Sequence, residues 1–195
     1  MLVFDAEQHV YAVDGVKIPS VTGIIASAGV LGQSPKFYTP EAADRGTRVH
    51  QACAEFDLGV SNPVLREDEQ GYLESYKKWL SSVPVAWDSI EQRKYSKTYG
   101  FAGTADRVGT VSGKPAVVDL KTGSPCGIAH ALQLCFYDLL HDDIPAGRRR
   151  RICLYLRSSG RLPQSVEFTS QLDYVLTHQL LTRGIHNNGP DNPTV

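Results

Sequence analysis

The sequence predicts an α/β protein in which helices precede and follow a run of three strands. Three observations lead to this class. Apolar and aromatic residues have helical spacing up to about residue 81, a strand-like region at 88–121 contains two turn signals, and a second helical pattern at 126–141 precedes an apolar strand at 152–157. The predicted order is therefore helix, three-strand meander, helix, strand.

The first elements are a predicted hairpin and a short helix. Residues 2–18 alternate apolar and polar side chains around an Asp-Gly dipeptide, which is typical of tight hairpin turns. Ser20 can cap a short helix that Gly29 would end. Residues 30–40 have the composition of a loop.

Two longer helices are predicted before the strands. The first runs from about 41 to 57 and starts after Pro40, with an acid in its first turn that complements the helix dipole. The second runs from about 66 to 81. Its apolar and aromatic side chains are expected to pack in the core: Tyr72, Leu73, Tyr76, Trp79 and Leu80.

The region 88–121 is predicted to form three consecutive antiparallel strands, with breaks at Tyr99-Gly100 and Ser112-Gly113. The elements predicted after it are a helix at about 126–141, a strand at 152–157, a further strand at 164–169, a helix at 170–183 and a polar tail. A chain of 195 residues fits one domain. We expect its core at about 41–157, between an N-terminal hairpin and helix (1–40) and a C-terminal helix and tail (158–195).

The composition excludes several classes of protein. Hydrophobic residues at 42% and charged residues at 21% are ordinary globular values, so the chain is not intrinsically disordered. No apolar run approaches the roughly 20 residues of a membrane-spanning helix, and the N-terminus lacks the pattern of a secretion signal. We expect a soluble, cytoplasmic protein without a membrane partner.

The cysteines and the net charge are less informative. Cys53, Cys126, Cys135 and Cys153 form no C-x-x-C pair, which argues against a zinc site or a disulfide framework. The net charge of −1 gives no general attraction to nucleic acid, so DNA binding would need local basic groups and metal ions.

Two aspartates in the meander are predicted to face each other. If Ser112 and Gly113 form a two-residue turn, residues whose numbers sum to 225 are opposite, so Asp106 lies opposite Asp119. Directly paired residues have Cβ atoms about 4.5–5.5 Å apart, and two carboxylates at that distance repel each other unless a proton or cation intervenes. A magnesium ion, which prefers carboxylate oxygens, would remove this repulsion.

Lys121 is predicted on the same face as Asp119, because side chains two apart in a strand point the same way, and Leu120 should face the core. The ammonium group could orient or deprotonate a metal-bound water, or stabilise negative charge on a phosphate. From spacing alone, a surface ion cluster on an exposed hairpin is the more common arrangement of two acids and a lysine.

The motifs that contain these residues resemble the PD-(D/E)xK nuclease superfamily, specifically its RecB-like, Cas4-like and phage exonuclease branch. GTADRV at 103–108 is similar to the G-x-x-D element of the family, and VVDLKTG at 117–123 to its D-x-K element. The resemblance covers about residues 15–157 and includes PSVTGII at 19–25, which looks like phage versions of the family.

Two further motifs match in the expected order. The R-G-x-x-x-H helix of the family resembles Arg45, Gly46 and His50, and its Q-x-x-x-Y helix resembles Gln133 and Tyr137. The chain departs from relatives that hold an iron–sulfur cluster, because its four cysteines do not have their arrangement of one upstream and three downstream cysteines.

The resemblance implies a restriction-endonuclease-like core, with a central mixed sheet flanked by helices. It also implies that one or two magnesium or manganese ions are held by His50, Asp106, Asp119 and the Leu120 carbonyl. The implied catalytic residues are Asp106, Asp119, Lys121, Gln133 and Tyr137, with Gln133 near the lysine and Tyr137 near either the substrate or Gln133.

The function that follows is a metal-dependent DNA nuclease, in particular an exonuclease of phage or mobile-element recombination or DNA processing, with a recombination or replication protein as a candidate partner. The alternative is a catalytically silent nucleic-acid-binding or scaffolding protein with the same fold. The intact D…D-x-K pattern favours the enzyme.

Other charged residues have ordinary interpretations. Glu91 could be an outer metal ligand or a substrate contact, although a solvated acid is the more common case. Basic groups could contact phosphates at the edges of the site, or could simply be solvated: Arg93, Lys94, Lys97, the run 148–151, Arg157 and Arg161.

Overall fold

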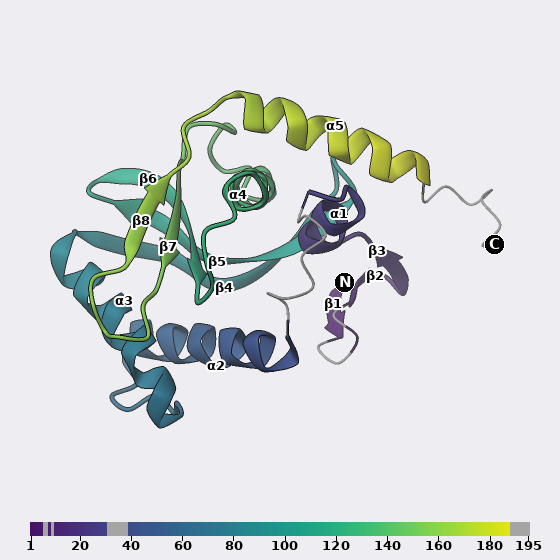
Figure 1. Cartoon of the computed structure of the whole chain (residues 1–195). Coiled ribbons are helices and arrows are strands. Elements are labelled where there is room, and N and C mark those ends of the chain that lie inside the picture. Colours follow the sequence, from purple (N-terminus) through teal and green to yellow (C-terminus); the bar gives the residue numbers. More distant parts are fainter. Residues whose placement is uncertain (6–7, 9, 31–38, 188–195) are drawn as a thin grey trace.

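The computed structural model has a five-stranded central sheet flanked by helices, with a separate small sheet at the N-terminus (Figure 1). The structure describes residues 1–5, 8, 10–30 and 39–187, and the side chains of these up to Arg183. The predicted α/β class with a central mixed sheet is confirmed. Most of the loop expected at 30–40 and the end of the polar tail lie outside the described residues.

The order of the elements agrees with the predicted one, with shifts of a few residues at their ends. No helix in the described ranges is long and apolar enough to cross a membrane. In chain order the elements are β1 (Leu2–Asp5), β2 (Val10–Val13), β3 (Val16–Ile18), α1 (Val21–Ser27), α2 (Pro40–Asp57), the 3-10 helix η2 (Glu67–Glu69), α3 (Gln70–Ser82), β4 (Val85–Ser96), β5 (Phe101–Val111), β6 (Lys114–Lys121), α4 (Gly127–Leu140), β7 (Arg150–Tyr155), β8 (Gln164–Glu167) and α5 (Leu172–Asn187).

The central sheet has the strand order β4-β5-β6-β7-β8. Strands β4, β5 and β6 form the predicted antiparallel meander, and β6 pairs with β7 in parallel. A parallel pair needs a long crossover connection, which α4 supplies here. The strand expected at 164–169 is present as β8, antiparallel to β7.

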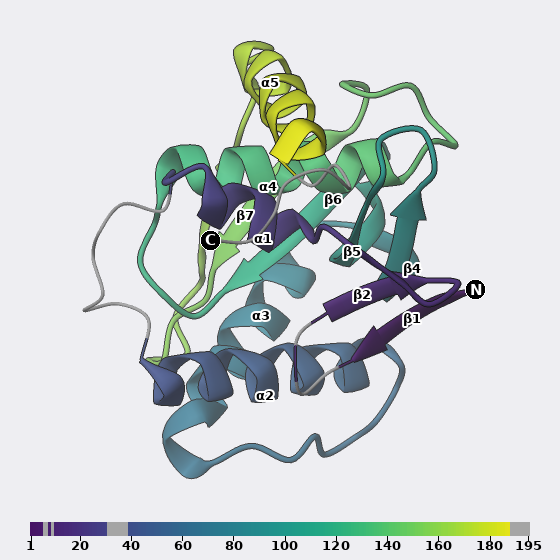
Figure 2. The ribbon, with the colours of Figure 1, turned by 90° about the vertical axis from the view of Figure 1, so that its right-hand side faces the viewer.

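Helices cover both faces of this sheet (Figures 1 and 2). Helices α2 and α3 pack against one face, where Val118, Leu120 and Ile152 lie in the same apolar cluster as Tyr76 of α3. Helices α1, α4 and α5 cover the other face, in a second cluster. The aromatic stripe predicted for the second helix contributes Tyr76 and Trp79 to the buried core, as expected.

The N-terminal region forms a three-stranded sheet instead of a single hairpin. Its β2–β3 turn lies at Asp14 and Gly15, where φ values of 51° and 83° suit the predicted tight turn. This small sheet contacts the central sheet, since the Tyr11 hydroxyl hydrogen-bonds the Thr104 hydroxyl at 2.6 Å and the Arg93 guanidinium lies over the Phe4 ring. The N-terminal sheet therefore packs beside the strand that carries Asp106.

Local signals account for the start of α2 and for the β5–β6 turn. The Thr39 side chain accepts the Ala42 N–H, and Pro40 occupies the first turn, where its missing N–H costs nothing. Ser112 and Gly113 both have positive φ, at 52° and 73°, which matches the right-handed twist of a two-residue hairpin.

Close packing at Gly71 gives a test of the fold. A Cβ atom at this position of α3 would lie 1.7 Å from the backbone oxygen of Ser158, so something must shift. We expect Gly71→Ala to lower the free energy of unfolding by roughly 1–3 kcal/mol or more. Gly127→Ala, at an open position of α4, should be neutral or stabilise by up to about 1 kcal/mol. Urea denaturation of both variants measures the difference, and equal stabilities would contradict the packing.

Candidate metal centre

Strands β5 and β6 stop pairing where the two predicted aspartates lie. The hairpin follows the predicted register, and its last pair joins Arg107 to Val118. The next pair would join Asp106 to Asp119, but the Asp106 carboxylate instead accepts the Leu120 N–H at 2.7 Å. Both aspartates are buried, and Leu120 faces the core as predicted. The two carboxylates therefore lie where the strands diverge.

The alternation of side chains along β5 is also broken at this point. Ala105 and Val108 are three residues apart and would face opposite sides of a regular strand, yet both lie in the core cluster beneath α4. On the neighbouring strand β4, Glu91 has a φ of 48°, which is rare for a residue other than glycine. Such strained conformations cluster at functional sites.

Three side chains from three elements converge beside this irregularity. His50 of α2, Glu91 of β4 and Asp106 of β5 each offer a ligand atom, and these atoms lie within 4.8 Å of one another. The His50 Nδ1 atom is 3.4 Å from Asp106 Oδ2 and 3.8 Å from Glu91 Oε1. The other ring nitrogen, Nε2, lies 2.8 Å from the Leu120 carbonyl oxygen, which fixes the orientation of the imidazole.

The expectation of a solvated acid at Glu91 is wrong. Its carboxylate accepts a hydrogen bond from Arg107 at 3.2 Å and lies in the cluster with His50 and Asp106. The pairing of Ile90 with Arg107 and of Gln92 with Ala105 places Glu91 beside Asp106. This register runs unchanged from Ser96–Phe101 at the β4–β5 turn to Ser89–Val108, and the irregularity after Trp87 lies beyond it.

Arg107, which sequence reasoning missed, connects the cluster to the helical layer. It is fully buried, and its Nε atom donates to Asp57 at 2.6 Å while Nη1 donates to the Asp106 carbonyl at 2.6 Å. Asp57 also accepts the Tyr76 hydroxyl at 2.8 Å, and the guanidinium lies over the Tyr76 ring. A buried cation thus offsets the carboxylates of Asp57 and Glu91.

Asp119 and Lys121 form a second group beside the cluster. The Lys121 Nζ atom is 2.6 Å from Asp119 Oδ2, and the Cys153 thiol donates to the same oxygen at 3.7 Å. The other oxygen, Oδ1, is buried and has no hydrogen-bond partner among the described residues. A buried carboxylate oxygen without a partner is costly, so a cation at this oxygen would stabilise the site.

The pKa values show how the site balances its charges without a cation. Burial lowers the pKa of His50, but the Asp106 and Glu91 carboxylates outweigh it and raise the value to about 9. Burial and the Asp106 charge raise the pKa of Glu91 to about 7. Burial alone would raise the pKa of Asp106, whereas His50 and Lys121 lower it to about 2. A protonated imidazole therefore holds the position among these carboxylates that a metal ion would suit.

The donors present fit a divalent cation with oxygen preference, such as magnesium or manganese. The arrangement differs from the predicted one, in which Asp106 and Asp119 meet directly opposite each other. The tightest group contains Glu91 and leaves out Asp119, and the Leu120 carbonyl is engaged by His50. The ligand set itself stays a prediction.

Gln133 and Tyr137 lie on α4 and contact each other. Gln133 Nε2 donates to the Tyr137 hydroxyl at 2.8 Å, which is one of the two expected positions for Tyr137. The face of α4 that carries these residues is covered, because His130, Tyr137 and His141 are all buried. Burial raises the pKa of Tyr137, and the charges of Asp119 and Asp106 add to this rise.

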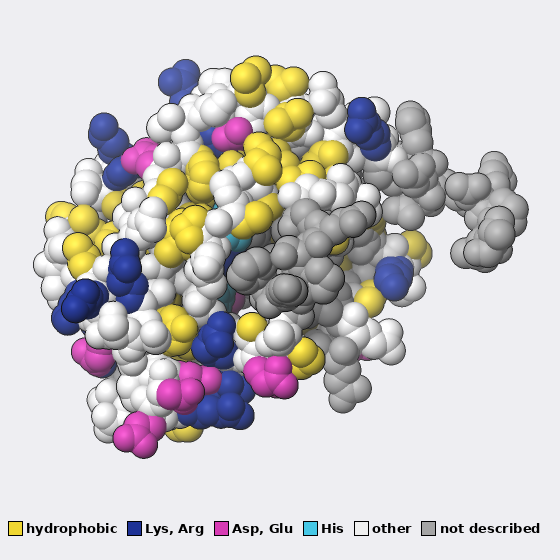
Figure 3. All heavy atoms as spheres, in the orientation of Figure 1, with side chains coloured by type: hydrophobic (Ala, Val, Ile, Leu, Met, Phe, Trp, Pro, Cys, Tyr) yellow, Lys and Arg dark blue, Asp and Glu magenta, His cyan; other side chains and the backbone are white. Residues whose placement is uncertain are grey.

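The arginine run at 148–151 is mostly engaged within the fold. Arg149 is buried and binds Asp138, and Arg151 is buried and binds Asp173. These two side chains are therefore not phosphate contacts. Arg150 pairs with Glu167, whereas other basic groups are exposed: Arg148, Arg157 and Arg161. Across the face in Figure 3, the lysine and arginine side chains of the described residues are dispersed, and several stand beside acidic ones.

His50 gives a test by pH in chelator-treated protein. Because its pKa is raised to about 9 in the folded state, His50 stabilises the fold fully below its unfolded pKa of about 6.5 and loses that contribution as the pH rises through about 9. The stability difference between wild type and His50→Gln should therefore shrink between about pH 6 and 10. Thermal unfolding at a series of pH values measures this stability difference. In an Asp106→Asn background, most of the change of the difference with pH should be lost. A difference that is constant with pH would contradict the charge balance.

Arg107 gives a second test. Removing one partner of a buried ion pair leaves an uncompensated charge, so Arg107→Met should lower the free energy of unfolding by about 3–5 kcal/mol. Arg107→Lys keeps the charge but loses the planar set of donors, so its free energy of unfolding should lie between those of wild type and Arg107→Met. The matched control is Arg161→Met at an exposed arginine, which should change stability by less than about 0.5 kcal/mol. Similar effects of both methionine variants in urea denaturation would argue against the network.

A comparison with protein families agrees with this geometry. The family model for the PD-(D/E)XK nuclease superfamily matches residues 28–178, a range that contains α2, the meander and α4. No curated protein matches the chain. The match over most of the chain shows that this protein belongs to the PD-(D/E)XK nuclease superfamily, a family of phosphodiester-hydrolysing nucleases.

Proposed function

We propose that the protein is a divalent-metal-dependent DNA nuclease, with a centre built from His50, Glu91, Asp106 and Asp119 beside Lys121. One observation carries the proposal. Ligand atoms of His50, Glu91 and Asp106 lie within 4.8 Å of one another at the point where β5 and β6 diverge. The neighbouring Asp119 has a buried carboxylate oxygen without a hydrogen-bond partner among the described residues. An ordinary surface ion cluster would be exposed, whereas both aspartates here are buried.

The residues suited to hold magnesium or manganese are His50, Asp106, Asp119 and the Leu120 carbonyl, and Glu91 is a further ligand. A divalent cation at such a site supplies a Lewis acid for a phosphoryl oxygen and lowers the pKa of a bound water. His50 is oriented by the Leu120 carbonyl, which directs its second nitrogen toward Asp106. Arg107 holds Glu91 at the same centre.

Lys121 is the group that acts on the reacting atoms. Burial alone would lower its pKa, but without a bound cation Asp119 and Asp106 raise the pKa above the ordinary lysine value. The lysine is placed to orient or deprotonate a water, or to stabilise charge on a phosphate oxygen. Its side chain is 21% exposed, so the ammonium can meet a substrate. Gln133 and Tyr137 contact each other on α4, and Tyr137 is close enough to Asp119 and Asp106 for their charges to raise its pKa.

The finer assignment is an exonuclease that acts in phage or mobile-element recombination or DNA processing. It rests on the resemblance of the 19–25 segment and of the four motifs to the phage exonuclease branch. A recombination or replication protein is a candidate partner for such an enzyme. A catalytically silent binding protein would not need an intact lysine and carboxylate set.

Cleavage assays test the proposal. Labelled linear, end-blocked linear and circular DNA are incubated with magnesium or manganese. We expect degradation of linear DNA only, with Lys121→Ala slower by about 10²–10⁴-fold because one acid–base or electrostatic group is lost. Asp119→Asn should be inactive, whereas Asp142→Asn, at an exposed acid after α4, is the matched control and should stay active.

Each outcome distinguishes a part of the proposal. Cleavage of circular and end-blocked DNA at the same rate as linear DNA would refute the exonuclease assignment alone. If wild type and Asp119→Asn leave all three substrates intact with either metal, the assignment as a nuclease is refuted. DNA binding without cleavage would support the alternative of a catalytically silent nucleic-acid-binding protein.

A further inference from the structure

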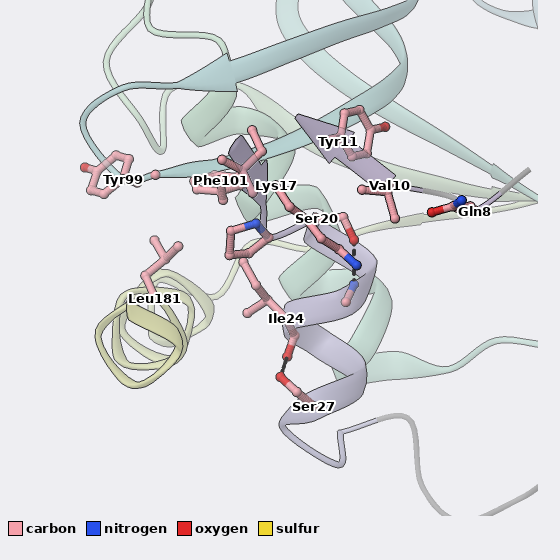
Figure 4. A pocket seen from close by; sticks show the side chains of 14 residues that line it. Gln8, Val10, Tyr11, Lys17, Ser20, Ile24, Ser27, Tyr99, Phe101 and Leu181 are labelled. Atoms are coloured by element: carbon pink, nitrogen blue, oxygen red, sulfur yellow. Dashed lines mark hydrogen bonds between the residues drawn. The ribbon is translucent and has the colours of Figure 1, made fainter. Parts of the chain in front are cut away.

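A pocket of about 400 Å³ lies between the N-terminal sheet, α1, the β4–β5 turn and α5 (Figure 4). Its lining includes Tyr11, Lys17, Tyr99, Phe101 and Leu181. We propose that this pocket binds an unpaired nucleobase of the DNA strand whose phosphate lies at the metal centre, an inference that rests on the proposed nuclease function.

The pocket has the size and surface of a site for a small aromatic group. Its volume falls in the range of about 300–1,000 Å³ that is typical of small-molecule sites. The wall combines aromatic and aliphatic side chains, such as Tyr99, Phe101 and Ile24, with the hydroxyls of Ser20 and Ser27. Bases of single strands stack on aromatic side chains, and the rings of this lining offer such a surface. The Ser20 oxygen accepts the Gly23 N–H and the Ser27 hydroxyl donates to the Ile24 carbonyl, so the capacity left for a base edge is a donor at Ser20 and an acceptor at Ser27.

Charge favours a nucleotide over an uncharged ligand. Lys17 lines the pocket and is exposed, so its ammonium group is available to the phosphate of a bound nucleotide. Tyr99 is half-buried, and its ring packs near Phe101 and His178, with centroid distances of 6.3 and 5.5 Å. These contacts hold the Tyr99 ring in position as a stacking platform.

One lining side chain, Tyr11, links the pocket to the strand that carries Asp106. Tyr11 lines the pocket, and its hydroxyl bonds Thr104 at 2.6 Å. Thr104 precedes Asp106 by two residues, which is roughly 6.6 Å along a strand. Glu91 is close enough to Tyr11 to contribute to its raised pKa, which is due first to burial. In the proposed arrangement, a DNA strand with a phosphate at the metal centre runs past Thr104 and places a neighbouring base in the pocket.

Most of the pocket lies outside the part of the chain that the family model matches. The match covers 28–178, whereas the lining residues from Gln8 to Ser27, and Leu181, fall before or after it. Only the β4–β5 turn, at 99–101, belongs to the matched range. Most of the pocket lining therefore comes from segments on either side of the matched range, and none of it belongs to the candidate metal centre.

The consequence is a preference for substrates with an unpaired base near the cleaved bond. A paired base is stacked inside the duplex and cannot enter a pocket without the cost of unpairing. Single-stranded or frayed ends should therefore bind better than blunt duplex ends.

Single-stranded oligonucleotides with one 2-aminopurine at successive positions test the pocket, with calcium in place of magnesium to limit cleavage. Stacking quenches this fluorescent base, so we expect quenching at one position relative to the bound end. Tyr99→Leu keeps an apolar side chain but removes the aromatic face, and should abolish the quenching and weaken binding by about fivefold or more. Tyr99→Phe keeps the face and should stay within about twofold of wild type.

Cleavage with magnesium supplies the second measurement. Tyr99→Leu should raise KM for single-stranded DNA and leave kcat unchanged, since Tyr99 is outside the candidate metal centre, and Lys17→Gln should raise KM by a smaller factor. The melting temperature of each variant must match that of wild type, which excludes a folding defect as the cause.

The possible results separate the two proposals. If wild type cleaves DNA but no position is quenched, or if Tyr99→Leu binds as tightly as wild type, the pocket proposal fails and the nuclease stands. If quenching depends on Tyr99 but the protein cleaves no DNA, the proposal that the pocket binds a base is supported and the proposed nuclease function is refuted. An effect of Tyr99→Phe as large as that of Tyr99→Leu would show that the hydroxyl matters and overturn the stacking role.

Discussion

The balance of buried charge at the end of the β5–β6 ladder is the constraint on which the rest of this structure depends. The carboxylates of Glu91, Asp106 and Asp119 are brought together by three neighbouring segments, and each would be unfavourable there without a nearby positive charge. His50 and Lys121 supply two of these charges from opposite faces of the sheet. The same balance is what a metal ion would complete at the partnerless Asp119 oxygen.

Arg107 links this balance to the architecture. Its guanidinium lies between the Asp57 carboxylate at the end of α2 and the Glu91 carboxylate on β4, so one buried side chain joins the helical layer to the site. Because α2 also carries His50, the same contact sets where the imidazole lies relative to Asp106. The position of the site residues and the stability of the fold are therefore coupled, and a residue outside the D…D-x-K motif affects both.

The irregular backbone of β4, β5 and β6 at the candidate metal centre also positions the site residues. A regular antiparallel ladder would pair Asp106 with Asp119, and the backbone N–H and C=O groups of the two strands would hydrogen-bond each other. The two side chains would then lie side by side on one face. The divergence of the strands frees the Leu120 N–H for the Asp106 carboxylate and the Leu120 carbonyl for His50. The positive φ of Glu91 on β4 belongs to the same distortion. The cost of this strain is offset by the surrounding two-layer packing.

The sequence by itself determined the α/β class, the order of the elements, the superfamily and the register of the β5–β6 hairpin. These follow from local signals, since a turn dipeptide and a strand period of two decide which residues face each other. Only the tertiary structure decided that Glu91 joins His50 and Asp106, that Arg107 binds Asp57, and that Arg149 and Arg151 are engaged inside the fold. Those contacts join residues far apart in the chain across a distorted strand, and no short-range pattern encodes the distance between two layers of a folded protein.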